Sequence, residues 1–503
     1  MTDTLYQWFE RSARKFADRT ALVIGARSWT YAELEQRALG LARAVAALPG
    51  EVPSRIALVT SKSFLGYAGY LAIQRLGACV VPINPEYPRD RNLDIVQRAG
   101  VRVALVEPGA DLFSALPQRF RPAVVGLDGH GDGTLPDLPD DPEREAYLLF
   151  TSGSTGQPKG VPILHRGIAP YVGYNIERYE VDEDARHSQV FGLTFDASTY
   201  DMFVTWGAGA TLVVPDKEDL YRPVDFIVGN RLTHWFSVPS VLRVAEQVGN
   251  LPRGRVKTVR HGLFGAEPVT VRDADTWLEV APGSRFHNLY GPTEVTITCT
   301  AYEVPDDRSA WAGGATVPIG RFYPTTEGVV LGEDGLPARD GELVLRGPQR
   351  FDGYLDPREN AGRFVRYEPG SPAVVHESGP VTRDLWYRTG DRVRWEGDDL
   401  VHRGRLDHQV KVMGHRVELG EVDAALHRHP DIVSAAAVAV VVDGQTRLWA
   451  GYTGKPVPPA DLELWLRGRV PLHMVPERVR HLDSLPLNDN GKTDRAKLTE
   501  VLR

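Results

Sequence analysis

The stretch Tyr147–Val161, YLLFTSGSTGQPKGV, joins an apolar run to a segment of small and polar residues that leads to a lysine. The run YLLF predicts a short buried strand. In Thr151–Gly156, glycines permit backbone angles that other residues avoid, and hydroxyl and N–H groups can converge on an anion. Lys159 adds a positive charge. The stretch therefore predicts a strand followed by a phosphate-binding loop. The alternative is a flexible surface loop, since Pro158 before the lysine and Gly160 after it depart from the usual P-loop pattern.

Strand-like and helix-like segments alternate on both sides of this loop. We expect helices at 5–16 and 31–48, and strands at 21–24, 55–60, 79–83, 102–106 and 123–127. This alternation predicts an α/β fold of layered sheets and helices with largely parallel strands. From residue 404 the pattern changes to short strands and a helix, followed by a strong strand at 434–442. We therefore expect a large domain at 1–406 and a small α+β domain at 407–503, with the boundary near Asp407.

Length and composition restrict the class of protein. A chain of 503 residues is expected to form more than one domain. A net charge of −8 disfavours a nucleic-acid-binding protein, which usually needs a basic face. Cys79 and Cys299 are the only cysteines, which argues against a disulfide framework or structural zinc. The N-terminus lacks the apolar core of a signal peptide, and no run approaches the ~18 apolar residues of a membrane span. We expect a cytoplasmic protein without membrane contact.

An acidic residue stands in an apolar neighbourhood at 192–203, GLTFDASTYDMF. A buried carboxylate is costly unless it is paired, and the ammonium group of a ligand could serve as the partner of Asp196. The alternative is that Asp196 caps a helix that starts near Ser198. From these residues alone the two interpretations are equally favoured.

Three further segments carry side chains suited to a nucleotide: NLYGPTE (288–294), YRTGDRVRW (387–395) and LNDNGKTDR (487–495). Tyr290 could stack on a base, Thr293 could donate to a phosphate, and Glu294 could bind Mg²⁺ through oxygen. Asp391 could accept both hydroxyls of a ribose. Each segment could also be an ordinary turn, and Lys492 an ordinary surface charge.

The order of these segments is more informative than any one of them. The chain resembles the ANL superfamily of adenylate-forming enzymes, and most closely the amino-acid adenylation domains of nonribosomal peptide synthesis, over nearly its whole length. The matching segments are WTYAEL (29–34), LAIQRLGACVVPINPEYP (71–88), LLFTSGSTGQPKGV (148–161), FDASTYDMF (195–203), NLYGPTE (288–294), GELVLRGPQRFDGYLD (341–356), YRTGDRVRW (387–395), GRLDHQVKVMGHRVELGEVD (404–423) and NGKTDR (490–495). The resemblance implies a large N-terminal domain and a small, mobile C-terminal domain that carries the catalytic lysine.

The same resemblance implies an ATP site. Its residues would be Thr151, Ser152, Gly153, Ser154, Thr155, Gly156, Lys159, Gly265, Ala266, Glu267, Asn288, Tyr290, Gly291, Asp391 and Arg405. Thr293 would contact the α-phosphate, Glu294 would hold Mg²⁺, and Lys492 would bridge the substrate carboxylate and the α-phosphate. The resemblance places the hinge between the domains at Asp407. In the family the small domain then rotates about this hinge, Lys492 leaves, and the segment around Gly414 comes to line a tunnel for a thiol.

The implied reaction activates an amino acid as its adenylate, releases pyrophosphate, and transfers the acyl group to the phosphopantetheine thiol of a carrier protein. Asp196 would bind the α-ammonium group. The other residues of the substrate pocket would be Ala197, Tyr200, Phe236, Leu263, Gly265, Leu289, Ile297, Thr298 and Lys492. A largely apolar wall predicts an aliphatic amino acid of leucine or valine size, with alanine or a nonproteinogenic analogue next.

Several alternatives stay open. We find no HHxxxDG motif and no carrier-like segment, so we expect a free-standing enzyme that loads a separate carrier protein. Whether it needs a small MbtH-like protein as activator stays open. The D-alanine–carrier ligases rank second, because those ligases tend to have cysteine where this chain has Gly265. An acyl- or aryl-CoA ligase is disfavoured by Asp196. An inactive scaffold protein is disfavoured by the intact Lys159, Glu294, Asp391 and Lys492.

Overall fold

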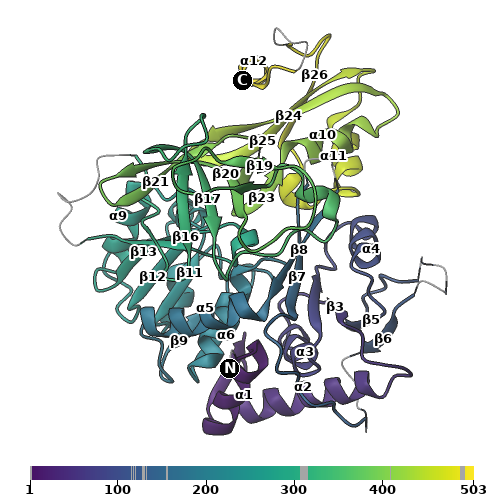
Figure 1. Ribbon diagram of the computed structural model, residues 1–503, viewed down its shortest axis with the longest axis vertical. Helices are drawn as coiled ribbons and strands as arrows, with labels where there is room; N and C mark the ends of the chain where they lie inside the picture. Colours follow the sequence, from purple (N-terminus) through teal and green to yellow (C-terminus); the bar gives the residue numbers. More distant parts are fainter. Residues whose placement is uncertain are drawn as a thin grey trace.

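The computed structural model describes residues 3–114, 116, 118, 121–126, 131, 133–153, 157–305, 315–407, 409–487 and 493–503. A large domain forms the lower part of the molecule in Figure 1, and a small domain that ends at the C-terminus lies above it. The large domain contains two mainly parallel sheets and a third, antiparallel sheet. This is the α/β architecture with a small α+β domain that the sequence predicts.

The first sheet supplies most of the floor of the site described below. It has nine strands in the order β15-β14-β13-β12-β11-β9-β10-β1-β2. Their bounds are β1 (Thr20–Ile24), β2 (Arg27–Thr30), β9 (Arg186–Ser188), β10 (Thr211–Val214), β11 (His234–Ser237), β12 (His261–Gly265), β13 (Arg285–Tyr290), β14 (Thr300–Glu303) and β15 (Arg321–Phe322). Strands β11, β12 and β13 run parallel, so their carboxyl ends meet at one edge.

The second sheet has the order β6-β5-β3-β4-β7-β8. Its strands are β3 (Arg55–Val59), β4 (Cys79–Ile83), β5 (Val103–Val106), β6 (Ala123–Gly126), β7 (Glu145–Thr151) and β8 (Lys159–Leu164). The apolar run that opens the glycine-rich stretch is the buried centre of β7, as predicted. Thr151 pairs with Lys159 across the β7–β8 hairpin, so the glycine-rich segment is the connection between these strands.

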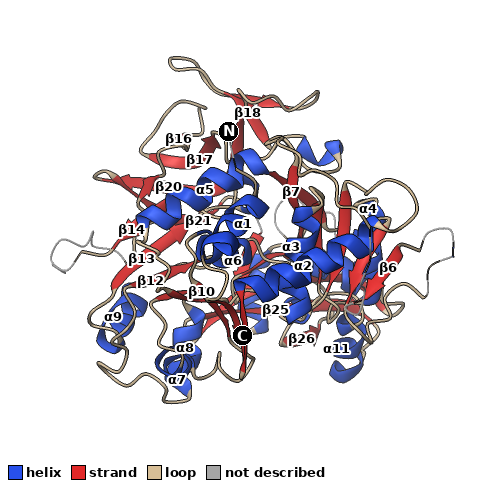
Figure 2. Cartoon of the chain, turned by 90° about the horizontal axis from the view of Figure 1, so that it is seen from below, coloured by secondary structure: helices blue, strands red, loops and turns tan. Residues whose placement is uncertain are grey.

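Helices pack between the two sheets and on their outer faces. The bounds are α1 (Leu5–Lys15), α2 (Tyr31–Ala46), α3 (Phe64–Arg75), α4 (Arg89–Arg98), α5 (His165–Arg178), α6 (Ala197–Gly207), α7 (Pro223–Gly229), α8 (Ser240–Gln247) and α9 (Val271–Val280). Figure 2 shows α1, α2, α3 and α6 between the two sheets. Thr4 and Gln7 form a capping box that starts α1, which then packs Phe9 edge-on against Trp206, with ring centroids 5.7 Å apart. Burial of each of these rings stabilises the fold by about 2–3 kcal/mol.

The remaining strands lead into the small domain. The third sheet contains β16 (Glu327–Leu331), β17 (Asp340–Arg346), β18 (Phe364–Arg366), β19 (Val374–His376), β20 (Trp386–Glu396) and β21 (Asp399–Arg405). The small domain contains β22 (Gln409–Val412), β23 (His415–Glu418), α10 (Leu419–His427), β24 (Ile432–Val442), β25 (Gln445–Gly454), α11 (Pro459–Arg467), β26 (Arg478–His481) and α12 (Arg495–Leu502). Its own apolar core joins α10 and α11 to β24 and β25.

The observed elements agree closely with the expected ones. The strand expected at 79–83 is β4, and the helix expected at 31–48 is α2, which ends at Ala46. Cys79 and Cys299 are both free and buried. Among the described residues, no helix is long and apolar enough to cross a membrane.

Candidate functional site

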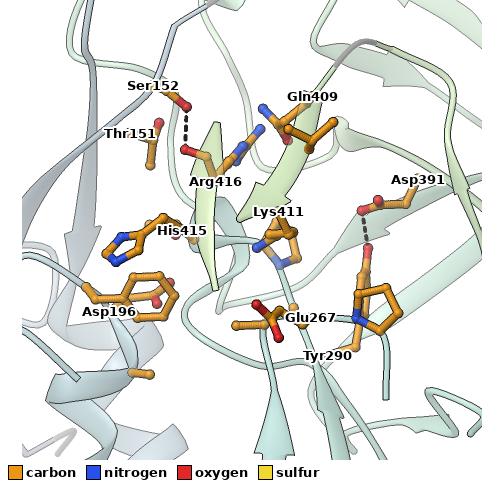
Figure 3. Close-up of a pocket in the computed structure, with 18 of the residues that line it drawn as sticks. Thr151, Ser152, Asp196, Glu267, Tyr290, Asp391, Gln409, Lys411, His415 and Arg416 are labelled. Carbon is orange, nitrogen blue, oxygen red and sulfur yellow. Dashed lines mark hydrogen bonds between the residues drawn. The ribbon is translucent and has the colours of Figure 1, made fainter. Parts of the chain in front are cut away.

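A cavity of about 500 Å³ lies between the large and small domains. Phe236 from β11, Glu267 after β12 and Tyr290 at the end of β13 line its floor, and the β22–β23 hairpin of the small domain enters from the other side (Figure 3). In α/β proteins, ligands bind beyond the carboxyl ends of the sheet strands. The cavity therefore lies where this fold places a small-molecule site.

Asp391 is a buried, ionised acceptor at one end of the cavity. Its Oδ2 accepts from the Tyr290 hydroxyl at 2.6 Å, and its Oδ1 lies 3.0 Å from both His402 Nε2 and Arg405 Nη1. Burial opposes ionisation, but the His402 hydrogen bond and the Arg405 charge outweigh it and hold the pKa of Asp391 well below its usual range. An ionised carboxylate is a good acceptor for hydroxyl groups, but protein donors contact both oxygens of Asp391 here. Its predicted role in binding a ribose stays a prediction.

Glu294 forms an ion pair that reaches across the two domains. Arg416 Nη1 donates to both carboxylate oxygens at 2.8 Å, and the Tyr354 hydroxyl donates to Oε1 at 2.7 Å. Burial raises the pKa of Glu294, but Arg416 and Tyr354 more than compensate and lower it to about 2.

This pairing bears on the predicted magnesium ligand. A carboxylate is a suitable donor for Mg²⁺, yet both oxygens of Glu294 are occupied by protein donors here. Among the residues that the structure describes, no group of histidine, cysteine and acidic residues is arranged to hold a metal. In this arrangement of the hairpin the residues do not fit Mg²⁺.

Asp196 lies at the other end of the cavity, at the start of α6. It occupies the N-cap position, but its side chain makes no capping hydrogen bond, which removes the main support for the capping interpretation. Burial raises the pKa of this carboxyl group, and a hydrogen bond with Thr293 and the nearby charge of Lys411 partly offset the effect. An ammonium ion would stabilise the ionised form in the same way.

The predicted pocket for the substrate side chain divides into residues at the cavity surface and residues behind it. Ala197, Phe236, Leu289, Ile297 and Thr298 line the cavity. Tyr200 and Leu263 are fully buried, and the Tyr200 ring packs edge-on against Phe236 with centroids 5.2 Å apart. Aromatic rings therefore form the back of the pocket and limit its depth.

Hydrogen bonds to neighbouring tyrosines occupy the hydroxyl group of Thr298 on this wall, whereas the buried Tyr200 hydroxyl has no partner among the described residues. Thr298 Oγ1 lies 2.7 Å from the Tyr171 hydroxyl and 3.0 Å from the Tyr323 hydroxyl. Thr296 and Ile297 both have positive φ values, 56° and 68°, which are strained for β-branched residues. The chain thus holds Thr298 in a fixed orientation, and its hydroxyl is engaged by the protein.

The glycine-rich segment is described in part. Thr151 and Ser152 line the cavity, and the Ser152 hydroxyl donates to the Arg416 carbonyl at 2.7 Å. Gly153 is described, but the predictions for Ser154, Thr155 and Gly156 fall outside the described residues. Lys159 is buried with its ammonium group 5.3 Å from the centre of the Tyr354 ring, and it is not among the described residues that line the cavity.

The turn after β12 approaches the small domain closely. A Cβ atom on Gly265 would lie 2.6 Å from the Leu289 carbonyl oxygen, so a glycine is required there. Ala266 follows with a φ of 62°, and Glu267 Oε1 accepts from the Gly414 N–H at 2.6 Å. Glu267 therefore holds the hairpin, a contact that the sequence does not indicate.

Asn288, Gly291 and Arg405, which were also predicted to bind the nucleotide, lie at different places in the cavity wall. Asn288 and Gly291 line the cavity, and Asn288 Nδ2 donates to the carbonyls of Val317 and Pro318 at 3.1 and 2.8 Å. Arg405 donates to Asp407 as well as to Asp391, so the predicted hinge residue joins the same cluster.

Lys492, the predicted catalytic lysine, lies outside the described residues. On either side of it, Leu487 and Thr493 form an isolated bridge, and neither lines the cavity. The following helix α12 packs on β24 of the small domain, at the top of Figure 1.

Lys411, Arg416 and His402 also line the cavity, although we assigned them no role from the sequence. Lys411 and Arg416 flank the Gly414 turn in the segment that matches the superfamily. One signal in the sequence could have identified Lys411 and Arg416. Both are basic, and they stand on the two strands of a hairpin with a glycine at its tip.

Comparisons with known proteins agree with this geometry. A family model described as AMP-binding enzyme matches residues 9–355, and one described as AMP-binding enzyme C-terminal domain matches residues 421–492. Phosphinothricin tripeptide synthetase PhsC of Streptomyces viridochromogenes is 35% identical over 99% of this chain and 45% of its own length. The chain thus spans less than half of that relative.

Two solved structures match over more than nine tenths of their own lengths. The Vibrio cholerae adenylation domain AlmE, in complex with glycyl-adenosine-5'-phosphate, is 25% identical with a TM-score of 0.82 over 99% of this chain and 97% of its own. NpsA-ThdA, an artificially fused adenylation-PCP di-domain from Klebsiella oxytoca, is 25% identical with a TM-score of 0.81 over 95% of this chain and 94% of its own. The chain belongs to the AMP-binding enzyme family, as an adenylate-forming ligase of the ANL superfamily and of the amino-acid adenylation type found in nonribosomal peptide synthetases.

Proposed function

We propose that the protein uses ATP to convert an aliphatic amino acid into an aminoacyl adenylate with release of pyrophosphate, and then transfers the aminoacyl group to the phosphopantetheine thiol of a carrier protein. The observation that carries this proposal is Asp196, a buried carboxylate between an apolar pocket and the Tyr290–Asp391 pair. The glycyl adenylate bound by AlmE and the carrier fused to NpsA support the two halves of the reaction by similarity.

The charge of the site favours an amino acid over other carboxylic acids. Asp196 is 6% exposed, and a fatty or aryl acid would leave it without a cationic partner. The substrate ammonium would supply that partner and direct the substrate carboxylate toward the nucleotide. The substrates of an acyl- or aryl-CoA ligase need not carry an ammonium group that could pair with Asp196.

The pocket wall favours a small aliphatic side chain. Phe236, Leu289 and Ile297 offer only apolar surface, and Thr298 uses its hydroxyl on neighbouring tyrosines. A charged side chain would be desolvated there without a partner. Because Tyr200 and Phe236 close the back, we expect valine, leucine or alanine to fit better than tryptophan.

The first step brings a carboxylate anion to the α-phosphorus of ATP, so charge repulsion is a large part of its barrier. We propose that Thr293 contacts the α-phosphate and that Lys492 bridges the two reactants, fixing their approach. Asp391 would accept the ribose hydroxyls. Glu294 would serve Mg²⁺ only after Arg416 has withdrawn, which requires the small domain to move about the hinge at Asp407.

ATP–pyrophosphate exchange across a panel of amino acids, including D- and β-forms, together with fatty and aryl acids, tests the proposal. We expect exchange with small aliphatic amino acids and none with the other acids. Exchange with fatty or aryl acids instead would assign the chain to the acyl-CoA ligases. Lys492→Ala should abolish most of the exchange, whereas an inactive scaffold protein would show none in either form.

A further inference from the structure

A second cavity, of about 430 Å³, lies where the start of α5 meets the third sheet of the large domain. None of the described residues that line it also lines the cavity between the domains. Four of its lining residues are arginines, Arg166, Arg346, Arg350 and Arg383, and two are acidic, Glu327 and Asp384. The proposed function gives no role to any of them, so this arginine-rich cavity needs an explanation of its own.

Arg350 is a buried cation without a contacting carboxylate. Its side chain belongs to a residue that is 2% exposed, and among the residues that the structure describes it forms no ion pair. Its Nη1 donates to the Phe351 carbonyl at 2.6 Å and its Nη2 to the Thr382 carbonyl at 2.9 Å, whereas its Nε has no described partner. Burial lowers the pKa of the Arg350 guanidinium group to about 10. A buried charge without a counterion is unfavourable, so an anion in the cavity would stabilise it.

Two further arginines lie near Arg350 and are paired only with exposed acids. The positive charges of Arg166 and Arg383 both lower the pKa of Arg350, which places them within electrostatic range of it. They share the carboxylate of Glu143, whose side chain is 45% exposed, and Arg166 also pairs with Asp352, whose side chain is 40% exposed. Solvent screens such pairs, and each contributes little. Both guanidinium groups can therefore contact an additional anion.

The acidic residues of the cavity do not neutralise Arg350 by contact. Glu327 pairs with Arg346, the fourth arginine of the cavity. Asp384 is exposed, and among the described residues it forms no ion pair. Asp352 and Asp384 act on Arg350 electrostatically and partly offset the effect of its burial on its pKa, but neither forms an ion pair with it in the described part of the chain. The place of a contacting anion is therefore left to a ligand.

The segment that carries Arg350 is held in place from behind. The Phe351 N–H donates to the Glu294 carbonyl at 2.8 Å, and the Thr296 hydroxyl donates to the Gln349 carbonyl at 2.6 Å. Both neighbours of Arg350 are thus anchored to the loop that follows β13. A charged group presented by such a fixed segment needs little reorganisation to bind a ligand.

The number of arginines favours a phosphate group over a carboxylate. A guanidinium group donates in a planar fork that matches two oxygens of either anion. One arginine can therefore use both oxygens of a carboxylate, whereas a phosphate has further oxygens for a second and a third arginine. Three arginines from separate segments of one cavity are suited to the second case.

We propose that this second cavity is a binding site for a small phosphate compound, which Arg350, Arg166 and Arg383 hold through its phosphate oxygens. The inference goes beyond the proposed function and does not depend on it. Inorganic pyrophosphate and a phosphate ester carry the same group, so either could be the ligand.

Calorimetric titration of the full chain tests the inference. The probes are inorganic pyrophosphate and ribose 5-phosphate, and citrate, whose charges are on carboxylates, is the control. We expect at least one phosphate compound to bind with a Kd of about 1 mM or lower. Arg350→Met should weaken this binding about 10- to 100-fold, because a buried charged contact is lost. Arg383→Gln should weaken it about 3- to 5-fold, because this contact is exposed.

A matched variant and a chemical probe locate the anion. Arg253→Met, which removes an exposed arginine that pairs with Glu279, should bind as the wild type does. Phenylglyoxal modifies accessible arginines, and mass spectrometry identifies each modified residue. The bound phosphate compound should protect Arg166 and Arg383 from phenylglyoxal. Protection of Arg405 and Arg416 instead would place the anion between the domains and overturn the inference.

The outcomes separate the possible ligands. Tighter binding of pyrophosphate would identify an inorganic phosphate compound, tighter binding of ribose 5-phosphate would identify a phosphate ester, and both support the site. Tighter binding of citrate than of either, or unchanged phosphate affinity in Arg350→Met and Arg383→Gln, would overturn it. If urea unfolding shows that Arg350→Met does not fold, Arg383→Gln decides alone, since it changes an exposed side chain.

Discussion

Mild acid should destabilise the nine-stranded sheet through a row of buried histidines. His187, His234, His261 and His287 lie on neighbouring strands with successive ring centroids 5.5, 5.3 and 5.2 Å apart. All are buried, and burial lowers the pKa of each ring, to about 4 for His187 and His261. The folded protein therefore keeps these rings neutral at pH values where an unfolded chain would protonate them.

The magnitude follows from proton linkage. A histidine in an unfolded chain has a pKa near 6.5, whereas His187 in the fold has a pKa of about 4. Its contribution to stability is therefore present above about pH 6.5 and is lost as the pH falls toward 4. Between about pH 7.5 and pH 5.5, His187 alone should lower the free energy of unfolding by about 1 kcal/mol. The other rings act in the same direction.

His187→Phe isolates this effect. The substitution keeps a stacked ring, removes the buried Nε2 that lacks a partner, and loses the contact of Nδ1 with the Ser188 carbonyl. Burial raises the pKa of nearby Asp201, and this shift stabilises the fold as the pH falls, which opposes the effect of the histidines. The pH dependence of the wild type must therefore be compared with that of His187→Phe.

Urea unfolding followed by tryptophan fluorescence at both pH values measures the free energies. We expect the wild type to lose about 1 kcal/mol more than His187→Phe between about pH 7.5 and pH 5.5. His376→Phe, on the edge strand β19, should lose as much as the wild type. Equal losses in the wild type and His187→Phe would show that the buried ring does not resist protonation, and the reasoning would be wrong.

Three further predictions concern the site. Asp196→Asn should lower kcat/KM for the amino acid in pyrophosphate exchange by at least about 100-fold, because the substrate ammonium loses a buried ionic partner, and a matching rise in the KM for ATP would contradict this role. Phe236→Ala should lower the free energy of unfolding by about 3 kcal/mol and shift the amino-acid panel toward larger side chains, since it removes the ring that packs on Tyr200; an unchanged panel would contradict the proposed pocket. Gly414→Ala should slow transfer to pantetheine more than pyrophosphate exchange, because the added methyl group meets Val238, and equal effects on both assays would count against the hairpin contact.

Local sequence patterns predict much of the fold and part of the site. The strand at Cys79–Ile83 and the helix that starts at Tyr31 follow from apolar periodicity, which is a property of neighbouring residues. Tyr290 and Asp391 were singled out within their own short segments, and the fold brings them into a hydrogen bond although they are 101 residues apart.

Contacts set by tertiary structure could not be predicted in this way. The histidine row has no periodic spacing in the sequence, and it exists because parallel pairing aligns His234 with His187 on one side and with His261 on the other. Glu267 was predicted to lie at the nucleotide; it lines the cavity, and its contact with the Gly414 N–H of the small domain is the part that the sequence did not indicate. Such contacts depend on how the domains meet, which no short segment encodes.

The ion pair between Glu294 and Arg416 connects the site to the expected movement of the small domain. A carboxylate whose oxygens both accept from one arginine, with Tyr354 donating to one of them, has little capacity left for a metal ion. Under the proposed function, Mg²⁺ accompanies ATP, so the seated hairpin and the bound metal exclude each other. The same hairpin brings Lys411 to the place between Asp196 and Asp391. Under the proposed function, this arrangement would therefore suit the state after pyrophosphate has left, in which Arg416 would neutralise the charge of Glu294.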